Sequence, residues 1–215
     1  MKDELDTQTV DAYADDGKAP VNAEAVTGRR FKGSKTPDIH RQSWSTPDWI
    51  IDFSNARFGT IGIDVCASAE NAKAERYYTE ADNALADGKD WGDEGGIAWC
   101  NPPYADPLPW VEKAIQQAKD RNVTTIMLVN SDASTAWFFR AIQYASTAIH
   151  IIGFEGGDGK FKNGRVAFVD ASNGKEGSKN PKASVIFEIK PKRKGQVKTE
   201  YLSRPQMESI GAKLI

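Results

Sequence analysis

Between residues 60 and 153, short apolar runs alternate with amphipathic segments along the chain. Apolar runs bounded by turn residues predict strands at 60–65, 95–100, 124–130 and 147–153, with a further short strand at 77–79. Apolar positions that recur every three to four residues predict helices at 69–77, 108–121 and 134–145. Such alternation is typical of an α/β fold with a mostly parallel sheet.

The segments on either side of this region are expected to add one helix and two strands. Thr46 is predicted to be an N-cap, with Pro47 at the first helical position and Asp48 in the first turn. Apolar runs at 165–171 and 183–190 are predicted to pair as a C-terminal antiparallel hairpin attached to the sheet.

The folded domain is expected to span residues 41–190, with a tail on each side. Residues 1–40 carry both acidic and basic residues and little apolar periodicity, so we expect a disordered tail. Residues 191–215 are predicted to form a basic, polar tail with one short helix at most.

Composition narrows the class of protein. The chain has 215 residues, of which 40% are hydrophobic, and this suits one globular domain. Its apolar runs are too short to cross a bilayer, and its N-terminus does not resemble a secretion signal. With two cysteines and two isolated histidines, neither a disulfide framework nor a metal site is expected. The sequence therefore predicts a cytoplasmic protein with no metal and no membrane partner, and a monomer is favoured.

Charge is distributed unevenly along the chain. Residues 46–158 hold seventeen acids and eight bases, whereas residues 159–200 hold eleven bases and four acids. The basic segment is predicted to be a polyanion-binding face, and a solvated lysine-rich loop is the alternative. Contacts to the phosphates of such a polyanion are expected from the cations on its loops, which are Lys160, Lys162, Arg165, Lys175, Lys179 and Lys182.

The segment Trp99–Trp110 contains four prolines between a predicted strand and a predicted helix. In open α/β sheets, ligands bind at the carboxyl ends of the strands, where this segment and Asp64 are expected. The Asn101 side chain and the Pro102 carbonyl offer two acceptors, which suit an amine with two hydrogens. Pro103 adds rigidity, and Tyr104 adds a flat face for stacking. These residues indicate a site for the exocyclic amine of adenine or cytosine.

Several motifs occur in a characteristic order, namely W-S-T-P-D, G-I-D-V-C-A-S, D-W, N-P-P-Y and P-W-V. Over residues 43–190 this order resembles the phage-type DNA N6-adenine methyltransferases of the Dam family. The resemblance implies a Rossmann-like class I methyltransferase fold with S-adenosylmethionine as cofactor. It also implies direct methyl transfer to a flipped adenine in double-stranded DNA, with GATC as the target, inside a bacterial host cytoplasm if the protein is phage-encoded. Residues 101–104 would then be catalytic, and residues 41–190 would form the methyltransferase domain.

The resemblance also implies cofactor-binding residues in three places. The loop after the first strand would contain Asp64, Cys66 and Ala67. The element that closes over the methionine end would contain Trp44, Thr46 and Pro47. The acidic-aromatic pair beside the cofactor adenine or the target base would be Asp90 and Trp91. Asp82 is the alternative acid for the ribose hydroxyls.

Two departures from the family pattern are visible. The loop after Asp64 has no glycine, and the interval from Asp64 to Asn101 is short, so one strand-helix unit must be compressed. Two alternatives stay open at this point. One is methylation of N4 of cytosine or of another amine. The other is an inactive nucleic-acid-binding or anti-restriction protein with this fold.

Overall fold

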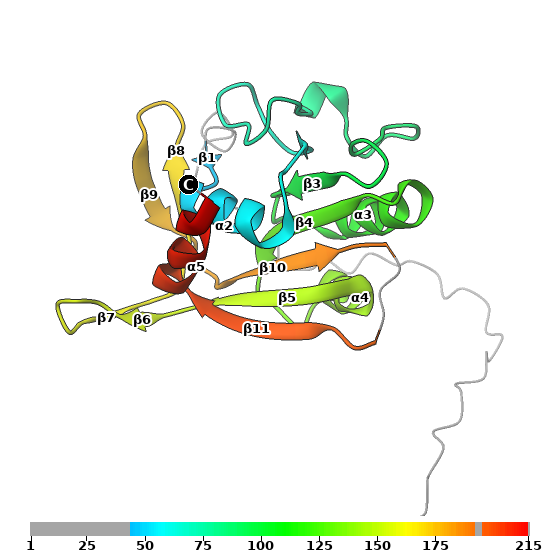
Figure 1. The fold of residues 1–215 in the computed structure, drawn as a ribbon. Helices are drawn as coiled ribbons and strands as arrows, with labels where there is room; N and C mark the ends of the chain where they lie inside the picture. Colours follow the sequence, from blue (N-terminus) through cyan, green and yellow to red (C-terminus); the bar gives the residue numbers. More distant parts are fainter. Residues whose placement is uncertain (1–43, 192–194, 215) are drawn as a thin grey trace, which may run out of the picture. The chain divides into compact units, whose positions relative to one another are not determined.

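The computed structural model describes residues 44–191 and 195–214, which form an α/β fold around a six-stranded mixed sheet (Figure 1). The strand order is β11-β5-β10-β4-β3-β2. The bounds are β2 Ile63–Asp64, β3 Ile97–Cys100, β4 Thr124–Asn130, β5 Ala145–Ile152, β10 Ser184–Ile189 and β11 Lys198–Ser203. Three neighbouring pairs are parallel (β2 with β3, β3 with β4, β5 with β11), whereas β10 is antiparallel to both β4 and β5. The carboxyl ends of β2, β3, β4 and β5 therefore lie along one edge of the sheet.

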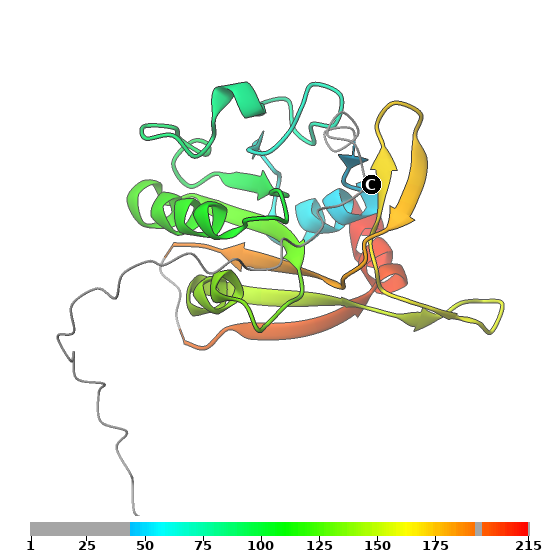
Figure 2. The ribbon, with the colours of Figure 1, turned by 180° about the vertical axis from the view of Figure 1, so that it is seen from behind.

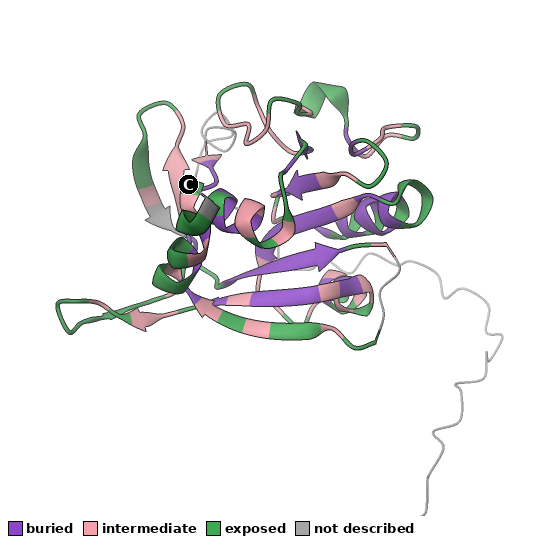
Figure 3. Ribbon diagram, in the orientation of Figure 1, coloured by how far each residue is buried: buried purple, intermediate pink, exposed green. Residues whose placement is uncertain are grey.

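Helices cover both faces of this sheet (Figure 2). On one face lie α3 (Leu108–Arg121) and α4 (Ala136–Tyr144), which contribute Val111 and Phe138 to one buried cluster. On the other face lie α2 (Asp48–Phe58) and α5 (Arg204–Gly211), which contribute Phe53 and Met207 to a second cluster. The helices predicted at 108–121 and 134–145 are confirmed, because their apolar stripes face the sheet. Figure 3 shows that the central strands are buried.

The predicted C-terminal hairpin is wrong. Strand β8 (Ala167–Asp170) lies in a separate three-stranded sheet, between β1 (Trp44–Ser45) and β9 (Lys175–Lys179). Strand β10 instead lies inside the main sheet, between β4 and β5. All six residues of β10 are buried, as expected for a strand that is covered on both faces, whereas β8 is only half-buried.

The region between β2 and β3 is compressed, as predicted. The strand predicted at 60–65 is reduced to two residues, and the helix predicted at 69–77 is wrong, because this segment forms turns and bends. The short strand predicted at 77–79 does not form; Tyr77 alone makes an isolated parallel bridge to Asp64. A single 3-10 turn follows, η1 (Glu80–Asp82).

The segment after residue 190 contributes to the fold. It contains β11, which extends the main sheet, then α5 and the 3-10 turn η2 (Ala212–Leu214). Sequence patterning also missed a short hairpin of β6 (Phe154–Glu155) and β7 (Phe161–Lys162), which extends from the end of β5 (Figure 1). The tail predicted at 1–40 lies outside the described residues. Within the described ranges, no helix is long and apolar enough to cross a membrane.

Candidate active site

Two loops leave neighbouring parallel strands at one edge of the sheet. We call residues 65–73 the β2 loop and residues 101–107 the catalytic loop. They begin side by side, because β2 pairs in parallel with β3 and Asp64 is in register with Trp99. The segment before α2 joins them: Asn101 donates from Nδ2 to Thr46 Oγ1 at 3.3 Å, and Asn71 donates from Nδ2 to the Trp44 carbonyl at 3.2 Å. The structure thus brings together Trp44, Thr46, Asp64 and Asn101.

Thr46 does not cap helix α2, so that prediction is wrong. The buried residue Pro47 occupies the N-cap position, and no side chain caps the helix. The Thr46 hydroxyl is buried and accepts from Asn101 instead. Because this bond holds the amide nitrogen of Asn101, the amide oxygen is turned away from Thr46 and is available as an acceptor.

The catalytic loop is held by prolines and by an aromatic contact. Pro102 is buried and Pro103 is exposed. The half-buried ring of Tyr104 meets Phe168 of β8 edge-on, with centroids 6.2 Å apart. The Tyr104 hydroxyl is buried without a hydrogen-bond partner among the described residues, and this burial raises the pKa of the phenol. Tyr104 is therefore neutral and serves as an apolar surface.

The Asp64 side chain accepts hydrogen bonds from two backbone N–H groups of the β2 loop. Asp64 is 3% exposed; Oδ1 accepts from the Cys66 N–H and Oδ2 from the Lys73 N–H, each at 3.1 Å. Desolvation raises the pKa of Asp64 to about 6, although the two hydrogen bonds oppose the rise. Both oxygens accept from backbone donors of the β2 loop, so Asp64 orders this loop.

Asp82 lies at the rim of the same loop and is exposed. The Ala67 N–H donates to the Tyr78 carbonyl at 3.0 Å, which places the start of η1 close to the β2 loop. Asp82 Oδ2 accepts from the Thr79 hydroxyl and N–H at 2.7 and 2.9 Å, and these bonds lower the pKa of Asp82. Its other oxygen makes no hydrogen bond within the described ranges, so an ionised acceptor faces solvent here.

The structure places Trp91 in the core beside the first turn of α3, and it pairs Asp90 with the last residue of that helix. The Trp91 indole is fully buried, with Nε1 donating to the Ala84 carbonyl at 2.9 Å. Asp90 pairs with Arg121, the last residue of α3, at 3.1 Å. Because α3 has 14 residues and starts next to the catalytic loop, Arg121 lies roughly 20 Å along the helix from that loop. The Asp90 carbonyl accepts from the Tyr78 hydroxyl at 2.8 Å, so Asp90 is connected to the β2 loop through Tyr78. Trp91 packs in the core, and a contact of Asp90 with the cofactor adenine or the target base stays a prediction.

The small sheet fixes Trp44. In β1, Trp44 is in register with Asp170 of β8. Its ring lies so close to Gly177 of β9 that a Cβ at Gly177 would come within 2.1 Å of the indole. Only glycine fits at this position, and the small sheet therefore supports both Trp44 and, through Phe168, Tyr104.

Burial disfavours the thiolate form of both cysteines. Cys66 is half-buried and follows Asp64, and desolvation, with the nearby carboxylate, raises its pKa to about 12. Cys100 is fully buried in β3, and burial also raises its pKa. Across the described ranges, no group of three or more His, Cys, Asp or Glu side chains is placed to hold a metal ion.

The predicted DNA-binding cations differ in their surroundings. Four are exposed and form no ion pair with another described residue, namely Lys160, Lys162, Arg165 and Lys175. Lys182 instead pairs with Asp132 at 2.8 Å, so its charge is already matched. The side chain of Lys179 lies outside the described ones. Sequence reasoning missed Phe161, which is 73% exposed on the β6–β7 hairpin; no periodic pattern marks a two-residue strand.

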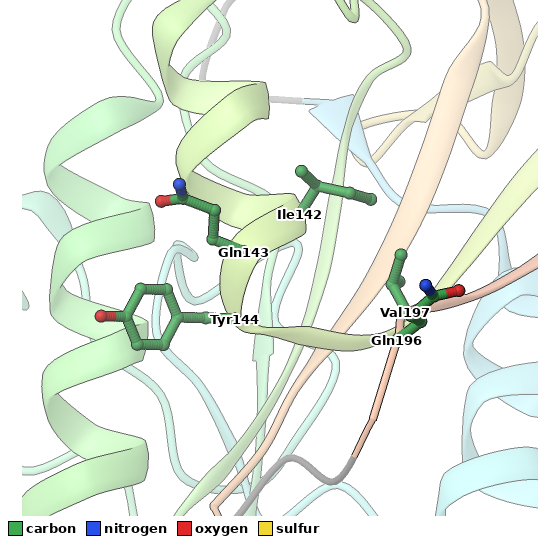
Figure 4. A pocket seen from close by; sticks show the side chains of 5 residues that line it. All are labelled: Ile142, Gln143, Tyr144, Gln196 and Val197. Atoms are coloured by element: carbon green, nitrogen blue, oxygen red, sulfur yellow. The ribbon is translucent and has the colours of Figure 1, made fainter. Parts of the chain in front are cut away.

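An open pocket of about 640 Å³ lies elsewhere, at the amino ends of β5 and β11 (Figure 4). Its lining residues are Ile142, Gln143, Tyr144, Gln196 and Val197. The amino ends of these strands are at the edge of the sheet opposite the catalytic loop. The pocket is therefore separate from the candidate active site.

Comparison with known proteins agrees with this geometry. Residues 33–214 match the family described as DNA N-6-adenine-methyltransferase (Dam). A DNA N-6-adenine-methyltransferase of Escherichia phage T1 is 37% identical over 94% of this chain and 92% of its own. A protein of the same description from Haemophilus phage HP1 is 32% identical over 83% of this chain and 96% of its own. The chain therefore belongs to the Dam family of DNA N-6-adenine-methyltransferases.

Proposed function

We propose that this protein transfers a methyl group from S-adenosylmethionine to the N6 amine of adenine in double-stranded DNA, with GATC as its site. The main support is the orientation of Asn101. Thr46 holds its amide nitrogen, and its amide oxygen is left as an acceptor at the carboxyl end of β3. An acceptor fixed before the substrate arrives costs little reorganisation during the reaction.

The residues of the β2 loop fit such a cofactor. The loop carries the small side chains Cys66 and Ala67, and Asp82 offers an ionised acceptor at its rim. We propose that Asp82 accepts from the ribose hydroxyls, while Trp44 and Pro47 close over the methionine end. When bound, S-adenosylmethionine would supply an electrophilic methyl group. Asp64 would act indirectly, by holding the loop in shape.

The catalytic loop would orient the acceptor amine. A base inside a duplex cannot reach the loop, so the target adenine must be flipped, at a cost of a few kcal/mol. Tyr104 would stack on it, and the amine would donate to Asn101 Oδ1 and to the Pro102 carbonyl. These bonds leave the nitrogen lone pair free to attack the methyl carbon. Transfer would break the bond between the methyl carbon and sulfur, S-adenosylhomocysteine would be the leaving group, and the nitrogen would lose one proton to solvent. Neither a metal nor a covalent enzyme intermediate is needed.

The proposed fold is of the Rossmann-like class I methyltransferase type, with a domain that begins near residue 41. Two parallel strands that carry the cofactor loop and the amine-binding loop side by side support this assignment.

We propose that DNA phosphates contact the β6–β7 hairpin and the residues that follow it. Lys160→Ala or Lys162→Ala should reduce the slope of log affinity against log salt by about one. Lys182→Ala is the matched control, because the ion pair with Asp132 already neutralises the charge of Lys182 and should weaken its attraction to phosphates. Binding isotherms between 50 and 200 mM salt measure these slopes, and equal slopes for all variants would contradict the assignment.

The test of the activity is transfer of tritiated methyl groups to defined duplexes with and without GATC, followed by digestion to nucleosides. We expect label in N6-methyladenine from the GATC duplex alone. Label in N4-methylcytosine would replace this proposal with cytosine methylation. Tight binding of cofactor and DNA without any transfer would favour an inactive binding protein.

A further inference from the structure

A second asparagine lies at the carboxyl end of the strand next to β3. Asn130 is the last residue of β4, and its side chain is half-buried. Its Oδ1 accepts from Nδ2 of Asn180 at 2.9 Å. Asn180 is buried, and its own Oδ1 accepts from the Lys182 N–H at 3.2 Å. A further backbone bond, from the Asn180 N–H to the Val166 carbonyl at 2.9 Å, fixes this residue in place.

This network determines which way the Asn130 amide faces. The Lys182 N–H can only donate, so the Asn180 atom next to it must be oxygen. The remaining Asn180 atom is the NH₂ group, which can only donate, so the Asn130 atom that meets it must also be oxygen. The Asn130 NH₂ group is therefore turned away from Asn180, and it has no hydrogen-bond partner among the described residues.

Asn101 and Asn130 project from the same face of the sheet. In the parallel β3–β4 pair, Cys100 is in register with Met127, so Asn101 comes opposite Leu128 and Asn130 follows two residues later. Side chains two residues apart along a strand share a face. With strands about 4.8 Å apart and a rise of about 3.3 Å per residue, the two Cα atoms lie roughly 8 Å from each other.

Among the residues that the structure describes, the two amides leave opposite groups unbonded at the neighbouring carboxyl ends of β3 and β4. Asn101 offers an oxygen, and Asn130 offers an NH₂ group. The Watson–Crick edge of adenine has the matching pattern, an amine that donates beside the ring nitrogen N1 that accepts. We propose that Asn130 donates a hydrogen bond to N1 of the flipped adenine, and that Asn180 is its positioning residue.

This assignment rests on the proposed function and adds a specificity determinant to it. Guanine and thymine present a carbonyl and a ring N–H at the same positions, so each would oppose an amide group of the same kind. A buried site that loses its partners in this way discriminates strongly. Cytosine has the same pattern as adenine, so the pair selects bases with an amine and leaves adenine and cytosine to be separated by size.

The test pairs a change in the protein with a change in one atom of the base. Duplexes carry either adenine or 1-deazaadenine, which lacks N1, as the target base. The target lies opposite an abasic site in both duplexes, so neither base is paired before it is flipped. For the unmodified protein, we expect kcat/KM to fall roughly tenfold on 1-deazaadenine. Asn130→Ala should lose about the same factor on adenine and should no longer distinguish the two bases.

Further variants separate recognition from folding. Asn180→Ala should reduce the adenine preference only in part, because Asn130 stays but is no longer oriented. Asn130→Asp keeps the acceptor for Asn180 and replaces the donor with oxygen, so adenine should be methylated more slowly than by Asn130→Ala. Ser131→Ala is the control: its hydroxyl pairs with His150 Nδ1 at 2.9 Å, and the full preference should persist.

The outcomes for the inference and for the proposed function are distinct. If the unmodified protein methylates no adenine, the proposed function fails. If it methylates adenine and 1-deazaadenine equally well, or if Asn130→Ala keeps the tenfold preference, the assignment of Asn130 alone is overturned.

Discussion

The catalytic loop and the β2 loop lie side by side, yet they are held in shape by different means. In the catalytic loop, three prolines (Pro102, Pro103 and Pro107) restrict the backbone. The β2 loop has neither proline nor glycine, and its path depends on two N–H groups that donate to the buried carboxylate of Asp64. One loop is restricted by its covalent structure, whereas the other is held by hydrogen bonds, two of which end on one ionisable side chain.

This difference predicts how each loop responds to change. Restriction by the proline rings does not depend on pH, so the Asn101 and Pro102 acceptors should keep their geometry. The β2 loop relies on a carboxylate whose pKa is raised to about 6 by burial, so its order depends on ionisation. Substitutions in the two loops should therefore separate methyl transfer from cofactor binding.

The largest effect is expected from Asn101→Ala. Loss of one preorganised group at the reacting nitrogen should lower kcat by about 100-fold or more. Cofactor affinity and the melting temperature should be close to those of the unmodified protein, because Thr46 loses only one bond of 3.3 Å. Single-turnover methyl transfer and calorimetry measure the two quantities, and a near-normal rate would refute the role given to Asn101.

Asp64→Ala should produce the reverse pattern. Two N–H groups lose their acceptor, and at about 1–3 kcal/mol for unsatisfied groups, S-adenosylmethionine should bind roughly 5- to 150-fold more weakly. The transfer rate at saturating cofactor should change little. Asp64→Asn keeps one acceptor and should lie in between. Unchanged affinity in Asp64→Ala would show that the loop holds its shape without the carboxylate.

The next effect concerns pH and stability. Because the pKa of Asp64 is raised from 3.8 to about 6, the folded state holds this proton more tightly than the unfolded state. Its contribution to the free energy of unfolding should therefore fall as pH rises from about 4 through about 6, by roughly 1–3 kcal/mol. Urea unfolding at pH 4.5 and 7 should show this loss relative to Asp64→Asn. Parallel curves for the two proteins would contradict it.

The smallest effect is expected from Pro103→Ala. Pro103 is exposed, so its replacement removes backbone restriction with little change in packing. Restriction of this kind contributes about 0.4–1 kcal/mol, which corresponds to a decrease of about two- to fivefold in kcat. Cofactor affinity should stay constant in the same titration. A drop comparable with that of Asn101→Ala would mean that Pro103 contacts the substrate directly.

Local patterns predicted the parts of this molecule that depend on neighbouring residues in the chain. Helix α3 and strand β4 were predicted correctly, because a segment with a buried face has apolar residues at regular short intervals or in an unbroken run. The adjacency of Asp64 and Asn101 also followed from strand-end loops in a parallel sheet. The Asn-Pro-Pro-Tyr segment was identified from the chemistry of its acceptors.

The features that were missed depend on contacts between distant residues. Pairing of β8 with β1 joins residues more than 120 positions apart, and no local period reports it. The same holds for Asn130, whose orientation is set by Asn180, 50 positions later. Trp91 was given a ligand-binding role because an acidic-aromatic pair resembles one, whereas its burial follows from contacts of the folded core such as Trp110.

The insertion of β10 between β4 and β5 has a consequence for synthesis of the chain on the ribosome. Ser184 pairs with Asn130, 54 residues earlier, so β4 and β5 each expose an unpaired edge until β10 has been made. Asn180 and Lys182, which orient Asn130, are made just before this strand. Nascent chains shorter than about 190 residues should therefore lack both the strand that joins β4 to β5 and the proposed orientation of Asn130, and their exposed strand edges should make them substrates for chaperones rather than active enzymes.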